Sequence, residues 1–160
     1  VQNITAKVHP LVIELVNRPN PRVGLEGKFS YQHSMAIGLI DGSAFPAQYT
    51  DDRVLDPQVA NLRDKVQATI DPRMSEDSTE ITITLQNGTS YEETVLHATG
   101  APENPLSDSM LNEKFRVLSK EVISNAQIEQ LLDLLWNLEK VPNISQVMEL
   151  TRPGRRSRRG

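Results

Sequence analysis

One helix near the carboxyl end carries more apolar surface than the rest of the chain obviously covers. We predict this helix over about residues 125–140. Its apolar side chains spread over more than half of a helical wheel: Ile128, Leu131, Leu132, Leu134, Leu135, Trp136 and Leu138. A helix that is apolar over so wide an arc must be covered on two sides. Since no other segment of the 160 residues obviously supplies the second cover, we expect this helix to pack against helices from outside the chain.

The first forty residues mix a strand with helical signals. Val1 to Val8 suits a strand, while the apolar run from Leu11 to Val16 fits either a strand or a helix. The two prolines and two glycines of residues 17–27 indicate an irregular loop. Ser30 can cap a helix that runs to about Ile40 and is closed by Asp41-Gly42. Because this helix has almost no polar face beyond its first turn, we expect it to be buried centrally.

Residues 56–97 contain a helix and a β-hairpin. Asp56-Pro57 is a strong helix start, and the following apolar stripe is formed by Val59, Leu62 and Val66. Residues 67–70 suit a strand, and residues 71–78 a polar connection. In the hairpin that follows, a two-residue turn would place Ile83 opposite Glu92. A three-residue loop, Gln86 to Gly88 with Gly88 at positive φ, would instead put Tyr91 and Val95 on the face of the isoleucines. We favour the three-residue loop.

The remaining residues are helical. After a rigid loop at residues 100–105, Ser107 can cap a helix whose narrow apolar stripe comprises Leu111, Phe115, Leu118 and Val122. We therefore predict an α+β fold with three parts. Residues 1–106 form a lid-like domain with a hairpin-containing sheet packed by helices, residues 107–150 form a helical extension, and residues 151–160 form a disordered basic tail.

Composition excludes several classes of protein. The formal net charge is −4, whereas a protein that neutralises many phosphates is usually basic, so we expect no nucleic-acid partner. The absence of cysteine excludes disulfides and thiolate nucleophiles. No apolar run approaches the roughly 18–20 residues that span a bilayer, and no signal peptide is evident. We therefore expect a cytoplasmic protein without a membrane partner. Since the chain opens with valine in a strand, we interpret it as a piece of something longer.

The stretch from Val8 to Asp41 resembles the MmgE/PrpD family. The most recognisable element is Gly24-Leu25-Glu26-Gly27-Lys28-Phe29-Ser30, followed by a helix of small residues and Asp41-Gly42. Later segments agree in order and spacing, and the resemblance covers about residues 1–120. These segments are Asp56-Pro57, the Asn87-Gly88 hairpin, Gly100 to Ser107 (GAPENPLS) and Glu113-Lys114-Phe115.

The resemblance implies an enzyme family with a shared chemistry. Its members include 2-methylcitrate dehydratase, cis-aconitate decarboxylase and iminodisuccinate epimerase. They transfer a proton at a carbon next to a carboxylate in a small di- or tricarboxylic acid, without a metal or cofactor. The family fold is a large helical domain plus an α+β lid, with the chain returning to the helical domain at its end. This return would cover the apolar helix at residues 125–140.

The resemblance also implies that the main catalytic residues lie outside this chain. The catalytic histidines and lysines of the family precede the position that matches Val1. We therefore expect the C-terminal, lid portion of a lyase or epimerase, inactive alone, that has the family helical domain as partner and forms a homo-oligomer such as a dimer. The specific activity we predict is that of a 2-methylcitrate dehydratase in propionate catabolism. The alternative is a stand-alone, non-catalytic module that dimerises or binds a partner.

Three residues near the predicted helix start are the local candidates for a site. Lys28 could anchor a substrate carboxylate, because the amino terminus of a helix favours anions. Ser30 could bind substrate, although capping alone explains it. His33 shares the apolar face of Ile37 and Ile40, where it is either a catalytic acid or base or a hydrogen-bonded core histidine.

The other polar groups favour structural roles. His9 and His97 are scattered from His33 without metal-ligand spacing, so we predict no metal. Residues 51–53 (DDR) suit a solvated loop with a local ion pair. The four arginines of the tail suit a flexible basic segment rather than a binding site: Arg155, Arg156, Arg158 and Arg159.

Overall fold

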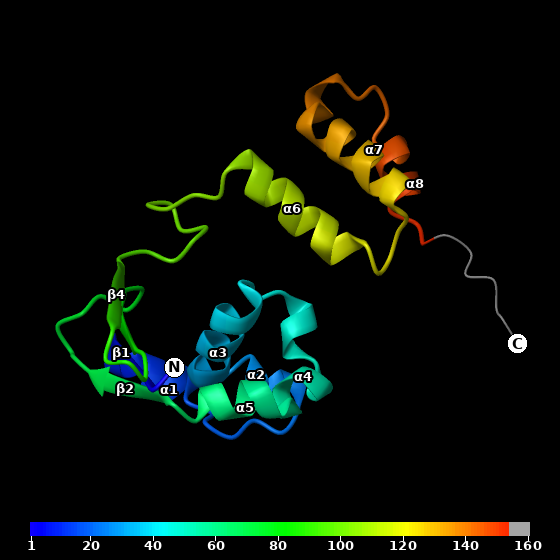
Figure 1. The fold of residues 1–160 in the computed structure, drawn as a ribbon. Coiled ribbons are helices and arrows are strands. Elements are labelled where there is room, and N and C mark those ends of the chain that lie inside the picture. Colours follow the sequence, from blue (N-terminus) through cyan, green and yellow to red (C-terminus); the bar gives the residue numbers. More distant parts are fainter. Residues whose placement is uncertain (154–160) are drawn as a thin grey trace, which may run out of the picture. The chain divides into compact units, whose positions relative to one another are not determined.

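The computed structural model describes residues 1–153, which fall into two compact units (Figure 1). The first unit, Val1–Pro105, contains strands and helices, and the second, from Leu106 onward, is helical. The predicted α+β fold with helices at its end is therefore confirmed. Most of the predicted tail, including its four arginines, lies outside the described residues.

A four-stranded mixed sheet in the order β2-β1-β3-β4 organises the first unit. Its strands are β1 (Asn3–Val8), β2 (Val66–Ile70), β3 (Thr79–Thr84) and β4 (Ser90–Val95). β1 pairs parallel with β2 and antiparallel with β3, which in turn pairs antiparallel with β4. Parallel neighbours need a long crossover, and the helices between β1 and β2 supply it. The side chains of Ile4, Ala6 and Val8 on one face of β1 are almost fully buried.

The hairpin between β3 and β4 has the register that the sequence favours. Ile83 pairs with Tyr91, and the N–H of Leu85 donates to the carbonyl of Thr89, so three residues form the loop. Gly88 has a φ of +85° within that loop. The prediction of a three-residue loop is confirmed, and the pairing of Ile83 with Glu92 is excluded. The loop is decisive because a one-residue slip would turn each side chain to the opposite face.

Short helices form the crossover. They are α1 (Pro10–Val16), α2 (Gly24–Gly27), α3 (Tyr31–Asp41), the 3₁₀ helix η1 (Pro46–Tyr49), α4 (Asp51–Leu55) and α5 (Pro57–Arg63). Helix α3 begins after Ser30, whose hydroxyl accepts from the N–H of His33, and ends at Gly42 with a φ of +65°. Asp56 caps α5 through the N–H groups of Gln58 and Val59. The predicted boundaries of α3 and the predicted start of α5 are thus confirmed.

Three expectations for this unit need correction. The predicted loop at residues 17–27 contains α2, whereas the run from Leu11 to Val16, for which the sequence left strand and helix open, is helical. Val66 does not extend the stripe of α5, because that helix ends at Arg63 and Val66 opens β2. Helix α3 is not centrally buried. Ala36 and Ile37 are fully enclosed, but Leu39 keeps 46% of its surface exposed, because α3 is covered by α5 and β2 along only part of its circumference.

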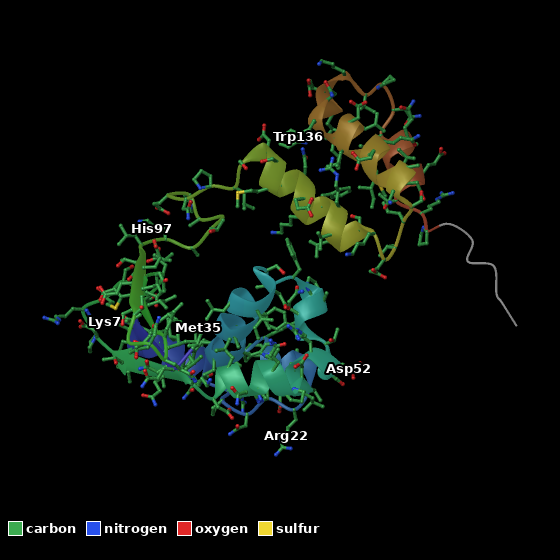
Figure 2. All side chains as sticks on the ribbon, in the orientation of Figure 1. Lys7, Arg22, Met35, Asp52, His97 and Trp136 are labelled. Atoms are coloured by element: carbon green, nitrogen blue, oxygen red, sulfur yellow. The ribbon has the colours of Figure 1, made fainter. Side chains whose placement is uncertain are left out.

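Over residues 106–153, the second unit contains three α-helices and a 3₁₀ turn. They are α6 (Asp108–Ser119), capped by Ser107 as predicted, α7 (Asn125–Trp136), η2 (Leu138–Lys140) and α8 (Ser145–Leu150). Its core gathers Ile123, Ile128, Leu131, Leu132 and Val147. The indole N–H of Trp136 donates to the side-chain carbonyl of Asn112 at 2.6 Å, which links α7 to α6 (Figure 2).

The sequence predicts that no second segment of this chain covers the apolar helix. For the side of α7 that faces α8, this prediction is wrong. Helix α8, which the sequence pattern did not indicate, packs Val147 into the core beneath α7. The carboxyl end of this helical segment remains open, since Leu135 and Trp136 of α7 and Leu138 of η2 each keep more than two fifths of their surface exposed. Within residues 1–153 no helix is long and apolar enough to cross a membrane.

Candidate functional site

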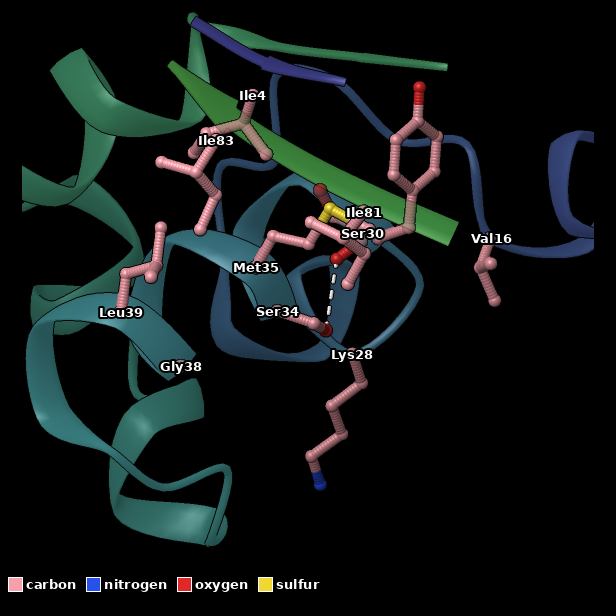
Figure 3. A pocket seen from close by; sticks show the side chains of 11 residues that line it. Ile4, Val16, Lys28, Ser30, Ser34, Met35, Gly38, Leu39, Ile81 and Ile83 are labelled. Atoms are coloured by element: carbon pink, nitrogen blue, oxygen red, sulfur yellow. Dashed lines mark hydrogen bonds between the residues drawn. The ribbon is translucent and has the colours of Figure 1, made fainter. Parts of the chain in front are cut away.

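An open groove of about 480 Å³ is the candidate site of the first unit (Figure 3). Its floor is the face of the sheet that carries Ile4, Ile81 and Ile83, and its wall is the uncovered side of α3. Met35 and Leu39 of α3 line that wall. The partial exposure of α3 therefore creates the groove. Polar groups occur mainly around the start of α3, namely Lys28, Ser30, Tyr31 and Ser34.

Two glycines fix the segment that leads into α3. A side chain at Gly24 would collide with the backbone carbonyl of Tyr49, and the Gly24 N–H donates to the Asp51 carboxylate at 2.7 Å. A Cβ at Gly27 would lie 2.7 Å from a methyl group of Val54. Only glycine permits this close approach. The GLEGKFS segment is therefore held against α4 and η1, and this contact sets the position of Lys28.

Ser30 and Lys28 both line the groove, but they differ in their contacts. Ser30 is 1% exposed, and its hydroxyl accepts from the His33 N–H at 3.1 Å and donates to the Gln32 amide oxygen at 3.2 Å. Its bonding capacity is thus used inside the fold. Lys28 is exposed and forms no ion pair with any of residues 1–153. Its side chain extends away from the isoleucines of the floor (Figure 3).

His33 lies on the buried side of α3 and does not line the groove. Its Nε2 is 2.9 Å from the carbonyl of Gln48, so Nε2 carries the proton and donates. Nδ1 has no partner among the described residues. Burial lowers the pKa of His33; the Gln48 carbonyl opposes this effect, and the positive charges of Arg63 and Arg53 add to it. The contacts therefore favour a neutral core histidine over a catalytic acid or base.

The predicted ion pair near residues 51–53 exists, but its partners lie elsewhere. These residues begin α4 rather than a solvated loop. Arg53 binds the carboxylate of Asp41 through two nitrogens and that of Asp56 at 2.6 Å. Arg53 thus joins the end of α3 to the start of α5. This contact is structural, and it lies outside the groove.

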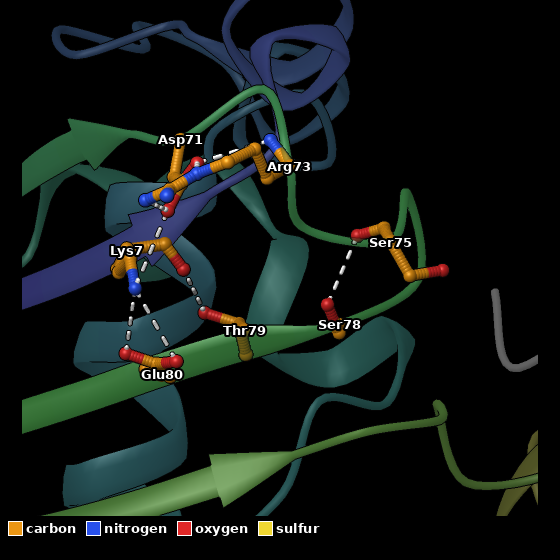
Figure 4. Close-up of polar contacts among 7 residues, drawn as sticks. All are labelled: Lys7, Asp71, Arg73, Ser75, Ser78, Thr79 and Glu80. Atoms are coloured by element: carbon orange, nitrogen blue, oxygen red, sulfur yellow. Dashed lines mark hydrogen bonds and ion pairs between the residues drawn. The ribbon is translucent and has the colours of Figure 1, made fainter.

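A second polar cluster lies at the end of β1 (Figure 4). Lys7 contacts the carboxylates of Glu80 at 3.2 Å and Asp71 at 3.5 Å. Arg73 donates to both oxygens of Asp71 at 3.0 Å, and this guanidinium holds the pKa of that carboxyl well below its usual range. No sequence pattern indicated this cluster, because its members come from three separate segments. Its charges neutralise one another, so we assign it to holding together the ends of β1, β2 and β3.

The other two histidines have structural contacts. Nδ1 of His9 accepts from the N–H of Leu11 at the start of α1. Nδ1 of His97 lies 2.8 Å from the Asp77 carboxylate on the exposed surface. Among residues 1–153, no group of three or more potential ligands from His, Cys, Asp and Glu is placed to hold a metal ion.

Within residues 1–105 the structure is an α+β domain with an apolar groove, and Lys28 is the one charged residue of the groove's lining. The sequence matches the family described as the MmgE/PrpD C-terminal domain over residues 1–138. The chain therefore belongs to the MmgE/PrpD family and represents its C-terminal domain, as the sequence motifs indicated.

The similar proteins of known name are much longer than this chain. It is 31% identical over 142 residues to a cis-aconitate decarboxylase of Mus musculus, an alignment that covers 86% of this chain and 29% of the relative. The corresponding enzyme of Homo sapiens is 28% identical over 86% of this chain and 30% of the relative. One from Aspergillus terreus is 26% identical over 81% of this chain and 28% of the relative. The chain thus spans less than a third of the length of these relatives.

Proposed function

We propose that this chain is the lid portion of a cofactor-independent lyase or epimerase that acts on a small di- or tricarboxylic acid. The observation that carries the proposal is the match to the family's C-terminal domain over residues 1–138, together with relatives named cis-aconitate decarboxylase. In this role the lid closes over a substrate cleft, expels water and holds the substrate for a base supplied by the helical domain of the enzyme.

Lys28 is the residue that we assign to the substrate. Its ammonium group is exposed, and no carboxylate within residues 1–153 pairs with it. It lies two residues before the first turn of α3, where helix N–H groups add to the positive potential. A polycarboxylate needs such cations, because charge stabilisation in a water-poor site lowers the barrier to proton removal. Ser30 caps α3 and His33 lies in the core, so we assign neither of them to the substrate.

The two tricarboxylate reactions of the family give different expectations. The names of the relatives favour decarboxylation of cis-aconitate, whereas the sequence resemblance led us to 2-methylcitrate dehydration and propionate catabolism. Both substrates present three carboxylates, so a lysine anchor suits either. We propose cis-aconitate as the first substrate to test and 2-methylcitrate as the second.

The test is a reconstitution assay. The purified chain is assayed with cis-aconitate and 2-methylcitrate, alone and with the part of the mouse relative that precedes the matched region. We expect turnover only in the mixture, and we expect Lys28→Met to raise KM or lower kcat/KM at least tenfold, while Lys28→Arg retains most activity. Turnover by the isolated chain would contradict our assignment of the base to the helical domain. Equal activity of Lys28→Met and the unmodified mixture would remove Lys28 from the substrate site.

The alternative is a non-catalytic module that dimerises or binds a partner, and one observation favours it. Leu135 and Trp136 at the end of α7 and Leu138 in η2 remain exposed, and an apolar surface of this kind indicates a missing neighbour. Light scattering across a range of protein concentrations separates the two proposals. A stable dimer that Trp136→Glu dissociates would favour the module, and a monomer that binds the helical domain through this surface would favour the lid.

A further inference from the structure

A shallow groove in the second unit, the α7–α8 groove, is lined by two exposed carboxylates. It lies between α7 and α8 and has a volume of about 440 Å³. Six residues line it: Gln130, Asp133 and Leu134 of α7, and Gln146, Glu149 and Leu150 of α8. Within residues 1–153, neither Asp133 nor Glu149 forms an ion pair. The lining of this groove therefore carries two negative charges and no positive charge.

The lining residues match the chemistry of an arginine side chain. A guanidinium group presents planar N–H donors that fit carboxylates, and it is more weakly hydrated than an ammonium group. The amide oxygens of Gln130 and Gln146 can accept further N–H groups. Leu134 and Leu150 offer apolar contact to the methylene stem, which long cationic side chains commonly bury. The occupant that this lining favours is thus a segment rich in arginine.

The chain itself carries such a segment close to this groove. Five arginines and no acidic residue follow Leu150, although the formal net charge of the whole chain is −4. The side-chain amide of Gln127 donates to the carbonyls of Leu150 and Arg152, each at 3.0 Å. Gln127 belongs to the first turn of α7, so the chain leaves α8 beside that turn. Residues 154–160, which we call the arginine segment, begin two residues after Arg152.

The groove is within reach of the arginine segment. An α-helix rises about 1.5 Å per residue, which places Asp133 about 9 Å along α7 from Gln127. An extended chain covers about 3.3–3.6 Å per residue, so the four residues from Pro153 to Arg156 span up to about 13–14 Å. The first arginines of the segment can therefore reach both carboxylates within one molecule.

We infer that the arginine segment docks in the α7–α8 groove of its own molecule, with an arginine held between Asp133 and Glu149. The sequence alone favoured a flexible segment, because a run of arginines does not identify a partner. The groove supplies that partner. The ion pairs are exposed to solvent, so the docking is weak and sensitive to salt, and it links α8 to α7. This inference concerns the second unit and does not rest on the proposed function.

A double-mutant cycle in the full chain tests the contact. The segment variant replaces four arginines by glutamine: Arg155, Arg156, Arg158 and Arg159. The groove variant is Asp133→Asn/Glu149→Gln. At about 0.01 M ionic strength, where the Debye length is about 30 Å, we expect the segment variant to lower the urea midpoint of Trp136 fluorescence by about 0.5 M. In the groove variant the same substitutions should change the midpoint by less than about 0.1 M, because the shared contact is already lost.

Glu121→Gln is the matched control for the groove variant. It removes the same charge from an exposed glutamate of the second unit that does not line the groove. In this background the segment variant should lower the midpoint by the full amount. At about 1 M salt, where the Debye length is about 3 Å, the effect of the segment variant should shrink at least threefold. Asp133, Glu149 and Glu121 are exposed, so we expect their variants to fold, which circular dichroism checks.

A spin label distinguishes docking within one molecule from docking between copies. The chain has no cysteine, so Ser157→Cys introduces a unique attachment site. At low salt we expect the label to broaden the amide signals of Asp133 and Glu149. The groove substitutions and high salt should each reduce this broadening at least twofold. In a mixture of spin-labelled chain with isotope-labelled chain that has no spin label, the isotope-labelled signals should stay sharp.

Three results would overturn the inference. The first is an equal loss of stability from the segment variant in the unmodified chain and in the groove variant, or no loss in either. The second is broadening in the mixed sample, which would make a second copy of this chain the source of the docked segment. The third is broadening that persists unchanged in the groove variant and at high salt, which would mean proximity without the proposed ion pairs.

Discussion

Two leucines of α7 provide a direct test of how the second unit is covered. Leu131 is 1% exposed, and Leu135, one turn later, is 42% exposed. The substitutions Leu131→Ala and Leu135→Ala remove the same atoms from the same helix. They therefore differ only in how much of each side chain the fold encloses.

The exposed fractions predict that the two substitutions lower the free energy of unfolding by different amounts. Truncation of a fully buried leucine to alanine costs about 2–5 kcal/mol, because both the transfer free energy and the enclosed cavity contribute. Truncation of Leu135 leaves no enclosed cavity and loses only part of the transfer free energy, so we expect about 1 kcal/mol or less. A unit of roughly fifty residues has a total stability of about 2.5–7 kcal/mol. Leu131→Ala should therefore remove between about a third and all of the stability of the second unit.

Urea unfolding followed by tryptophan fluorescence measures this difference. Trp136 is the one tryptophan of the chain, and it lies in α7, so its emission reports the second unit. With an m-value of about 1 kcal/mol/M, Leu135→Ala should shift the midpoint by about 1 M or less. Leu131→Ala should shift it by about 2 M or more, or should leave the unit unfolded without urea.

Equal losses of stability would refute the reasoning. They would mean that Leu135 is enclosed in the isolated chain, by other residues of the chain or by a second copy. Repeating the titration at two protein concentrations distinguishes these cases, because self-association makes the midpoint concentration-dependent. With either result, the carboxyl end of α7 would not be an open surface for a helical partner.

Three further predictions concern the first unit. Burial lowers the pKa of His33 below the 6.5 of the unfolded chain, so its contribution to stability is complete above about pH 6.5 and is lost as the pH falls to the folded-state pKa. The urea midpoint, followed by circular dichroism, should therefore fall across that pH window. His33→Phe should remove this pH dependence. Gly88→Ala should cost about 1 kcal/mol because of its positive φ, whereas Gly38→Ala, in a helix with free space around it, should stabilise by up to about 1 kcal/mol in the same titration. Ser30→Ala should cost about 1 kcal/mol through loss of the helix cap, and Lys28→Ala should leave the melting temperature unchanged; equal effects would contradict the division between a structural serine and a free lysine.

Helix caps and the hairpin register could be predicted because they depend on neighbours in the sequence. Ser30, Asp56 and Ser107 each accept a hydrogen bond from an N–H two or three residues ahead. The loop that ends at Gly88 sets which residues of β3 and β4 face each other. Such contacts need no distant partner, so the local pattern was sufficient.

The candidate site could be predicted only in part. The sequence indicated Lys28 beside a helix start and His33 on a buried face, and the structure has both there. The floor of the groove was not foreseen, because it joins Ile4 to Ile83 across the pairing of β1 with β3. The Lys7 cluster likewise depends on strand order, which alternating patterns do not specify.

The sequence by itself determined the caps at which α3, α5 and α6 begin, the residues that close α3, the register of the hairpin, and the family to which the chain belongs. Only the tertiary structure decided which apolar faces are covered: α8 shields one side of α7, while α3 keeps one side open above Ile81 and Ile83. The physical reason is the separation in sequence between the groups that make each kind of contact. A cap or a turn is stabilised by groups a few residues apart, whereas burial depends on which distant surfaces meet, and apolar periodicity identifies a face that must be covered without identifying its cover.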